Sequence, residues 1–390
     1  MKGLYLVLMM AFVVSCRTPR EVGPSRSASI IQTYIDSVKR SYAPDKRVAL
    51  FDVSARGSVI AGETNMPGAK AALYNYLVVS GVNFVDSISV VPNNIPGDQH
   101  FAVATVSVAN LRSQPRHSAE LSTQVTLGTP LNVLKKDGGW YLVQSPDKYL
   151  AWVDAGGIKL YDSADYTIWK NEEKLIYTSP VGKVSAANDS IPVSDIVYGS
   201  VLSIISTSDT HFEVRFPDGR MGFIGRDEAM LLKDWTSSRK PTGNEMVSSA
   251  RQLMGLPYLW GGTSVKGVDC SGFTKTVYFM NGLILPRDAS QQVNIGEAVD
   301  TSNNWSQLLE GDLLFFGVPA REGKPERVVH VGMWIGGDLS FIHSSGRVRV
   351  SSMNPGSSQY DESEHKRFLR AKRVTPSSAL IDLRSASLFQ

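Results

Sequence analysis

The first apolar segment of the chain is short and stands at its start. Lys2 precedes the run "LYLVLMMAFVV", which is followed by "SC" and so reaches Cys16. A positive start, a short apolar segment and a small residue before the break are typical of an export signal. The run is also shorter than the roughly 20 residues that a membrane-spanning helix needs. We therefore expect residues 1–16 to be a signal peptide and not a buried core helix.

Helix-like and strand-like patterns alternate in the next part of the chain. Residues 17–28, "RTPREVGPSRSA", are rich in Pro, Arg and Ser and predict a linker. "SIIQTYIDSVKRSY" has apolar residues at helical spacing, and "GAKAALYNYLVVSG" is enriched in Ala and Leu. "RVALFDVSA", "SVIAGET" and "FVDSISVVP" predict strands. We expect a small α/β module over residues 29–98, without a catalytic constellation.

Short strand-like runs separated by turn residues extend from about Phe101 to Leu232. Two passages share one pattern, in which a "WYLV" or "FEVRF" strand is followed by a short strand around "YLAWV" or "MGFIG". Each passage resembles a bacterial SH3-like barrel. Such barrels bind peptide or cell-wall polymer, or they only brace a neighbouring domain.

The last third of the chain predicts a helix followed by strands. "NEMVSSARQLMG" has helical spacing and a glycine stop, and "EGDLLFFGV", "VVHVGMWIG", "FIHSSG" and "VRVSSM" predict strands. We expect an α+β multidomain protein with a small α/β N-terminal module, two SH3-like β-barrels and a C-terminal α+β domain. The expected parts are the signal peptide at 1–16, the linker at 17–28, the α/β module at 29–98, the barrels at 99–165 and 166–238, the C-terminal domain at 244–374 and a tail at 375–390.

The amino-acid composition argues against one class of partner. Forty basic and 37 acidic residues leave a formal net charge of only +3. Nucleic acid and anionic surfaces are bound by strongly basic faces. We therefore expect no nucleic-acid partner.

One of the two cysteines lies at the expected start of a helix. In "VDCSGFTKTVYFMNG", Asp269 and Ser271 can satisfy first-turn N–H groups around Cys270. The partial positive charge of a helix N-terminus favours thiolate, the nucleophilic form. The alternative is that Cys270 is a small buried apolar residue.

Two histidines are candidates for the base. His330 lies in "VVHVGMWIG" and His343 in "FIHSSG", on strands that a turn connects. A hairpin would place them close together, so that one accepts the thiol proton and the other orients its ring. The alternative is that His330 and His343 are two unrelated residues on separate strands.

The motifs "PYLWGG", "DCSGF", "GDLLFF", "HVGMWIG" and "FIHSS" together resemble the motif series of the NlpC-type cell-wall cysteine peptidases, which are papain-like in fold. The resemblance covers residues 245–373 and implies that the C-terminal domain at 244–374 is a papain-like α+β catalytic domain. With two barrels before it, the chain resembles the gamma-D-glutamyl-L-diamino-acid endopeptidases (dipeptidyl-peptidase VI-like), which trim peptidoglycan stem peptides.

The resemblance implies a role for each matching residue. Cys270 would be the nucleophile, His330 the base and His343 the orienting residue, without metal or cofactor. In that family the free amine of the substrate is held partly from the first barrel, so an ammonium group could be shared by Glu120 and Asp269. "LPRDASQQ" also matches, and we expect its Arg287 and Asp288 to be structural. The expected substrate-binding residues are Tyr258, Asp269, Ser271, Glu120 and Tyr149.

The segment "VVSC" resembles the lipobox of bacterial lipoproteins, in which the cysteine carries the lipid. We expect Cys16 to be lipidated and the protein to be a membrane-anchored lipoprotein of the cell envelope, on the periplasmic side. Its expected partners are the membrane, through this anchor, and murein peptides.

The leading hypothesis is a cysteine endopeptidase that cuts the bond between gamma-D-glutamate and the diamino acid of murein stem peptides. Two alternatives remain open. One is a papain-like acyltransferase or amidase on another substrate, because the same residues perform acyl transfer in general. The other is a non-catalytic lipoprotein that binds the wall.

Overall fold

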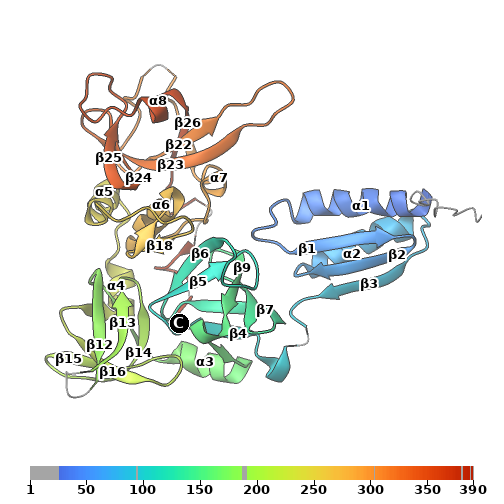
Figure 1. Ribbon diagram of the computed structural model, residues 1–390, viewed down its shortest axis with the longest axis horizontal. Coiled ribbons are helices and arrows are strands. Elements are labelled where there is room, and N and C mark those ends of the chain that lie inside the picture. The colour runs from blue at the N-terminus through green and yellow to red at the C-terminus, as the bar shows by residue number, and fades with distance from the viewer. Residues whose placement is uncertain are drawn as a thin grey trace, which may run out of the picture. The chain divides into compact units, whose positions relative to one another are not determined.

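The computed structural model describes residues 26–93, 95–186, 191–302, 304–378, 381–386 and 388–389 (Figure 1). The expected signal peptide, Cys16 and most of the expected linker lie outside the described residues. The chain forms two compact units, the first made of residues up to 42 and 51–89, and the second of residues 43–50 and 90–390.

The first unit is a small α/β module, as the apolar spacing predicts. Ile31, Ile35 and Val38 of its first helix are buried on one face. Its three strands form one sheet in the order β1-β2-β3. The elements are α1 (Arg26–Tyr42), β1 (Phe51–Arg56), β2 (Val59–Thr64), α2 (Pro67–Val79) and β3 (Val85–Val90).

Two seven-stranded sheets occupy the first half of the second unit, and we call them the first and second barrels. The strand order is β10-β4-β7-β8-β9-β5-β6 in the first barrel and β13-β12-β16-β15-β14-β11-β17 in the second. The first contains β4 (Phe101–Ala104), β5 (Val108–Arg112), β6 (Leu121–Thr126), β7 (Pro130–Asp137), β8 (Trp140–Gln144), β9 (Leu150–Asp154) and β10 (Ile158–Tyr161). The second follows helix α3 (Ser163–Asn171) and contains β11 (Lys174–Tyr177), β12 (Val181–Ser185), β13 (Pro192–Val197), β14 (Val201–Thr207), β15 (His211–Arg215), β16 (Met221–Gly225) and β17 (Ala229–Leu231).

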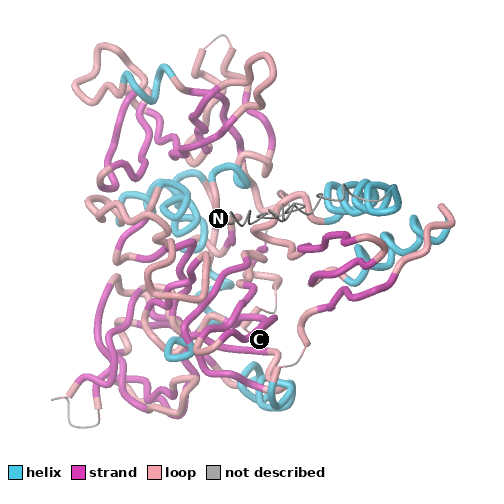
Figure 2. Tube along the Cα trace, turned by 45° about the vertical axis from the view of Figure 1, so that its right-hand side comes forward, coloured by secondary structure: helices cyan, strands magenta, loops and turns pink. Residues whose placement is uncertain are grey.

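The C-terminal domain has a six-stranded sheet in the order β21-β26-β22-β23-β24-β25. Helices α5 and α6 lie between this sheet and the barrels in both views (Figures 1 and 2). The helices are α4 (Leu232–Ser238), α5 (Gly243–Gln252), α6 (Cys270–Met280), α7 (Ala289–Gln292) and α8 (Glu362–Lys366). The sheet strands are β21 (Glu297–Val299), β22 (Leu313–Val318), β23 (Arg327–Gly336), β24 (Ser340–Ser345), β25 (Arg347–Ser352) and β26 (Phe368–Arg373), and short pairs are β18 (Thr263–Ser264) with β19 (Gly267–Val268) and β20 (Leu283–Ile284) with β27 (Ile381–Asp382).

The packing of α6 explains how the site is held in place. Phe273 and Val277, one turn apart on α6, are completely buried in one core cluster with Leu313 and Val331 of the sheet. Burying side chains of this size stabilises the fold by about 1.5–3 kcal/mol each. The start of α6 is therefore fixed against β23.

Two boundaries differ from the sequence-based expectation. Residues 43–50 belong to the second unit and not to the small module, because the carbonyl group of Arg47 accepts the backbone N–H of Leu150 of the first barrel at 2.7 Å. The expected tail packs on the domain, since Ile381 pairs with Ile284 and Phe389 is 7% exposed. Neither contact has a local sequence signal.

None of the helices in the described parts of the chain has the length and apolar character to cross a membrane.

Candidate active site

Cys270 is the first residue of α6, and the sequence "GVDCSGF" builds the turn that places it there. Asp269 caps the helix, because its Oδ1 accepts the backbone N–H of Gly272 at 2.7 Å. A side chain at position 272 is excluded, since a Cβ there would lie 1.9 Å from the carbonyl oxygen of Gly262. The glycine of this motif thus lets the helix start approach the "PYLWGG" segment.

The thiol of Cys270 is buried, with 7% of the residue exposed. Burial, together with the charge of Asp269, raises the pKa of the thiol to about 12, and hydrogen bonds from the backbone of Val331 and Ser271 offset this only in part. Desolvation of the thiol therefore outweighs the helix N-terminus, which by itself favours thiolate. Cys270 rests as a thiol and needs a base.

His330 and His343 lie together on the antiparallel hairpin of β23 and β24, as the sequence predicts. The Nε2 atom of His330 is 2.8 Å from the Nδ1 atom of His343. Because Nε2 is engaged, Nδ1 is the nitrogen of His330 that is available as a base. The residue after His330, Val331, hydrogen-bonds the sulfur of Cys270 through its backbone, so β23 runs directly past the nucleophile.

Both imidazoles are neutral at pH 7. Burial lowers the pKa of His330, and burial together with the neighbouring His330 lowers the pKa of His343 to about 2. A neutral imidazole can accept a proton from a thiol, whereas an imidazolium cannot.

A third ionisable group completes a cluster of possible metal ligands. One ligand atom each from His330, His343 and Glu364 lies within 4.8 Å of the others. The two imidazoles hydrogen-bond each other, and Glu364 forms an ion pair with Arg367. Each of these groups therefore has a protein partner, and the geometry favours an imidazole pair over a metal centre.

A cleft of about 700 Å³ reaches Cys270 and is lined by both the first barrel and the C-terminal domain. Strand β23 contributes Arg327, Val328 and Val329, directly before His330. The predicted site residues that line the cleft are Glu120, Tyr149, Asp269, Cys270 and Ser271. The five predicted residues alone are up to 151 positions apart in the chain, the difference between 271 and 120.

Asp269 is engaged by an arginine at the base of this cleft. Arg287 is 1% exposed, and its guanidinium donates to the two carboxylate oxygens of Asp269 at 3.1 and 2.6 Å. Arg287 also donates to the hydroxyl of Ser271 at 2.9 Å, and Gly261 donates its backbone N–H to Asp269 at 2.9 Å. The acceptor sites of Asp269 are therefore filled and its charge is compensated.

Glu120 differs from Asp269 because no cation pairs with it in the parts of the chain that the structure describes. Its Oε1 accepts the indole N–H of Trp260 at 2.7 Å. Trp260 belongs to the "PYLWGG" motif and is 61% exposed. The first barrel thus offers an uncompensated carboxylate to the cleft, fixed in place by a residue of the C-terminal domain.

Tyr149 lies on the same wall but has a protein partner. Its hydroxyl donates to Asp288 at 3.2 Å, and Arg47 donates to the same oxygen at 2.8 Å. Burial, with the charge of Asp288, raises the pKa of the Tyr149 hydroxyl. Arg47 is held in turn by Asp45. Tyr149 therefore lines the cleft as part of a polar network.

Tyr258 lies near the nucleophile. Burial, the nearby Cys270 and the charge of Asp269 raise the pKa of its hydroxyl to about 12. The hydroxyl therefore stays protonated at neutral pH and can donate a hydrogen bond.

Several cleft residues were not predicted as such. Arg287 and Asp288 were expected to be structural, yet both line the cleft, where they compensate Asp269 and hold Tyr149. The match of "LPRDASQQ" was their only signal. Arg47 had no signal that distinguishes it from a surface residue, and Trp260 had only its place in the "PYLWGG" motif. The role of each depends on contacts with distant parts of the chain.

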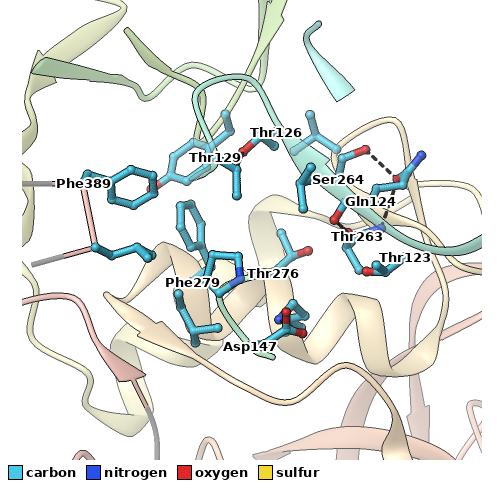
Figure 3. Close-up of a pocket in the computed structure, with 17 residues that line it drawn as sticks. Thr123, Gln124, Thr126, Thr129, Asp147, Thr263, Ser264, Thr276, Phe279 and Phe389 are labelled. Atoms are coloured by element: carbon cyan, nitrogen blue, oxygen red, sulfur yellow. Dashed lines mark hydrogen bonds and ion pairs between the residues drawn. The ribbon is translucent and has the colours of Figure 1, made fainter. Parts of the chain in front are cut away.

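A second cavity of about 90 Å³ lies elsewhere, at the junction of the first barrel, the C-terminal domain and the tail. Figure 3 shows Thr126, Phe279 and Phe389 around it. Its lining is mostly apolar, and none of the predicted site residues contributes to it. This cavity is a packing gap between parts of the second unit and not the candidate site.

Comparison with known proteins identifies the family of the chain. The NlpC/P60 family model matches residues 255–367, and the bacterial SH3 domain model matches residues 107–159. The chain is 30% identical over 248 residues to a gamma-D-glutamyl-L-lysine dipeptidyl-peptidase of Bacillus cereus, which covers 60% of this chain and 71% of that protein. The chain belongs to the NlpC/P60 family.

Other relatives agree with this membership. A dipeptidyl-peptidase 6 of Lysinibacillus sphaericus is 26% identical and matches over 65% of this chain and 92% of its own length. A crystal structure of an NlpC/P60 family protein from Bacillus cereus superposes with a TM-score of 0.60 at 25% identity, and covers 71% of this chain and 100% of its own. The expected fold class, the papain-like resemblance and the cysteine peptidase class are thereby confirmed.

Proposed function

We propose that this NlpC/P60 peptidase hydrolyses the bond between gamma-D-glutamate and the diamino acid of murein stem peptides that carry a free N-terminal L-alanine. The observation that carries the proposal is the cleft, which joins Cys270 to an uncompensated carboxylate, Glu120, from the first barrel. The names of the relatives, gamma-D-glutamyl-L-lysine dipeptidyl-peptidases, support cleavage of the same bond.

The reaction follows from the positions of three side chains. His330 Nδ1 accepts the thiol proton of Cys270 as the sulfur bonds to the gamma-carbonyl carbon of the glutamate. The amide C–N bond then breaks, and the proton passes from His330 to the leaving amine. Water next attacks the thioester, gives its proton to His330, and the C–S bond breaks to restore the thiol. His343 holds the ring of His330 through the 2.8 Å contact.

The free amine of the substrate is recognised by charge. An ammonium group loses its hydration in a cleft and needs an anion as partner. Asp269 is compensated by Arg287, so Glu120 is the carboxylate that remains for this role. An acylated amine, as in a stem still joined to muramic acid, has no charge and would leave Glu120 unpaired. The enzyme therefore acts on released wall peptides.

Three further residues shape the two sides of the substrate. Tyr258 donates its hydroxyl near the reacting carbonyl, Ser271 borders the nucleophile, and Tyr149 forms the wall that the first barrel supplies. These roles predict that substitutions of Tyr258 lower kcat, whereas those of Tyr149 raise KM.

The test is product analysis with two stem tripeptides, L-Ala-gamma-D-Glu-L-Lys and its diaminopimelate counterpart. Wild-type protein should release L-Ala-gamma-D-Glu, and Cys270→Ala should not. Adding hydroxylamine at low concentration distinguishes hydrolysis from acyl transfer, which is the first alternative. An acyltransferase would give mainly the hydroxamate, whereas a peptidase would give mainly the free acid. Binding of the peptide without turnover in the wild type would favour the non-catalytic alternative and refute the proposal.

We also propose that Cys16 carries a lipid and anchors the protein in the cell envelope, on the periplasmic side. The motif "VVSC" after a short apolar run supports this. Intact mass of the membrane fraction should show a lipid addition on a chain that begins at Cys16. An unmodified mature protein would refute the anchor without affecting the proposed peptidase activity.

A further inference from the structure

A hydrogen-bond chain continues beyond His343, away from the nucleophile. His343 Nε2 lies 3.0 Å from the hydroxyl of Ser351 on β25. The hydroxyl of Ser351 donates to Oδ2 of Asp361 at 3.4 Å, and the same oxygen is 4.0 Å from His343 Nε2. Ser351 and His343 are both completely buried, so water does not replace these contacts.

The hydrogen bonds from His330 to Asp361 all run in one direction, from donor to acceptor. A carboxylate only accepts hydrogen bonds, so Ser351 donates to Asp361 and must accept from His343 Nε2–H. His343 Nδ1 then carries no proton and accepts from His330 Nε2–H. His330 is left with an unprotonated Nδ1, which is the atom that has to take the thiol proton.

Asp361 is held rigidly at the end of the chain. Its Oδ1 caps helix α8 by accepting the backbone N–H of Glu364 at 3.1 Å, and its Oδ2 accepts from Arg349 at 2.9 Å. The carboxylate therefore cannot turn away from Ser351 without losing both contacts.

We propose that Ser351 and Asp361 are positioning residues that set the tautomers of His343 and His330 and so keep Nδ1 of His330 ready to accept the proton of Cys270. This inference rests on the proposed peptidase function, but it names residues outside the Cys270, His330 and His343 set.

The opposite tautomer shows why the acceptor matters. Without Ser351, the buried Nε2–H of His343 has no partner, and the proton is better placed on Nδ1. His330 Nε2 must then accept, so the proton of His330 moves to Nδ1. A proton on that atom blocks transfer from the thiol. Loss of a tautomer-fixing group in a catalytic triad can cost up to about 10⁴-fold in kcat, and we expect a smaller loss here because the ring of His330 keeps its place.

The test uses Ser351→Ala and Asp361→Asn in the full chain. Asparagine still caps α8 but removes the charge. Two matched controls are Ser352→Ala and Asp312→Asn. Ser352 is a completely buried serine on the same strand as Ser351, and its hydroxyl donates to the backbone carbonyl of Asp338; Asp312 is a buried carboxylate paired with Arg373. We expect kcat to fall about 10- to 100-fold in Ser351→Ala and about 10-fold in Asp361→Asn, with KM within twofold of wild type. In the two controls, kcat should stay within threefold of wild type.

The decisive readout is the ¹⁵N spectrum of labelled histidine. Wild type should show the Nε2–H form of His343, and Ser351→Ala should shift it toward Nδ1–H, while Ser351→Thr, which keeps the hydroxyl, restores the wild-type form. An unchanged tautomer in Ser351→Ala, or an equal loss of kcat in the controls, would overturn the inference.

A pH profile gives independent evidence. The charged and titratable groups that face the His330–His343 pair are Asp361, Glu364, Arg349 and Arg367. Removing the Asp361 anion destabilises an imidazolium in the pair. In the pH profile of activity, the limb that reflects protonation of the pair should therefore move to lower pH. An unmoved limb in Asp361→Asn would contradict the inference.

Failure of the inference and of the proposed function can be told apart. Alkylation of Cys270 by iodoacetamide, followed by mass spectrometry of its tryptic peptide, needs no substrate and reports proton acceptance by His330. If no stem peptide is cut but Ser351→Ala slows alkylation at least tenfold, the positioning role stands and the substrate assignment fails. If stem peptides are cut normally by Ser351→Ala, the positioning role fails and the peptidase stands.

Discussion

Replacing Glu120 with glutamine tests whether the first barrel reads the charge of the substrate. The change removes one negative charge and keeps a carbonyl oxygen that can accept the indole N–H of Trp260, which now bonds Oε1 at 2.7 Å. The wall of the cleft should therefore keep its shape. No cation pairs with Glu120 in the described part of the chain, so the substitution leaves no buried arginine or lysine without a partner.

The size of the effect follows from the environment of the carboxylate. A hydrogen bond to an ionised group contributes about 1.5–3 kcal/mol. Glu120 is exposed in the free protein, so water screens it and the lower end of the range applies. About 1.5 kcal/mol corresponds to a roughly tenfold lower kcat/KM on peptides with a free amine. Asp269 adds little to this because Arg287 compensates it.

The assay compares two tripeptides that differ only in acetylation of the L-alanine amine. Wild type should cut the free peptide and hardly cut the acetylated one, and Glu120→Gln should narrow this ratio by about tenfold. Alkylation of Cys270 should be unchanged in the variant. Equal cleavage of both peptides by wild type would refute charge recognition and leave the first barrel with a structural role.

The remaining predictions concern catalysis, packing and pH. Cys270→Ala should abolish turnover and leave the melting temperature within about 2 °C of wild type, and residual activity would contradict its role as nucleophile. Arg287→Met leaves Asp269 as an uncompensated buried charge and should destabilise the second unit by about 3–5 kcal/mol in urea unfolding; a loss below 1 kcal/mol would refute the compensation argument. Burial lowers the pKa of His343 to about 2, so the unfolded chain, with an ordinary pKa near 6.5, binds more protons below that pH. Stability should therefore fall as the pH drops, by about 2 kcal/mol from pH 7 to pH 5 for this residue, and His343→Gln should flatten the dependence whereas the exposed His117→Gln should not.

The sequence predicted those features that depend on local patterns. Helix α6 and its cap follow from "VDCSGF", in which a carboxylate stands before the first turn and a glycine permits a close approach. The hairpin that joins His330 to His343 follows from two strand-like runs with a short turn between them, and antiparallel pairing then fixes which side chains meet.

The rest depends on contacts between distant parts of the chain. Arg287 is 18 residues from Asp269, and Arg47 is 241 residues from Asp288. No periodicity in the sequence indicates either pair. The direction in which the pKa of the Cys270 thiol shifts also depends on such contacts. A helix end favours thiolate locally, but only the folded structure shows that β23 and the cleft wall exclude water from the sulfur.

The most direct test of the account is hydrolysis of L-Ala-gamma-D-Glu-diamino-acid tripeptide in H₂¹⁸O, followed by mass spectrometry of the products. Wild type should place one ¹⁸O atom in the gamma-carboxylate of released L-Ala-D-Glu, with the free diamino acid as the other product. Neither Cys270→Ala with the free tripeptide nor wild type with the acetylated tripeptide should give this product. Cleavage at another bond, or unchanged release by Cys270→Ala, would contradict the central claim.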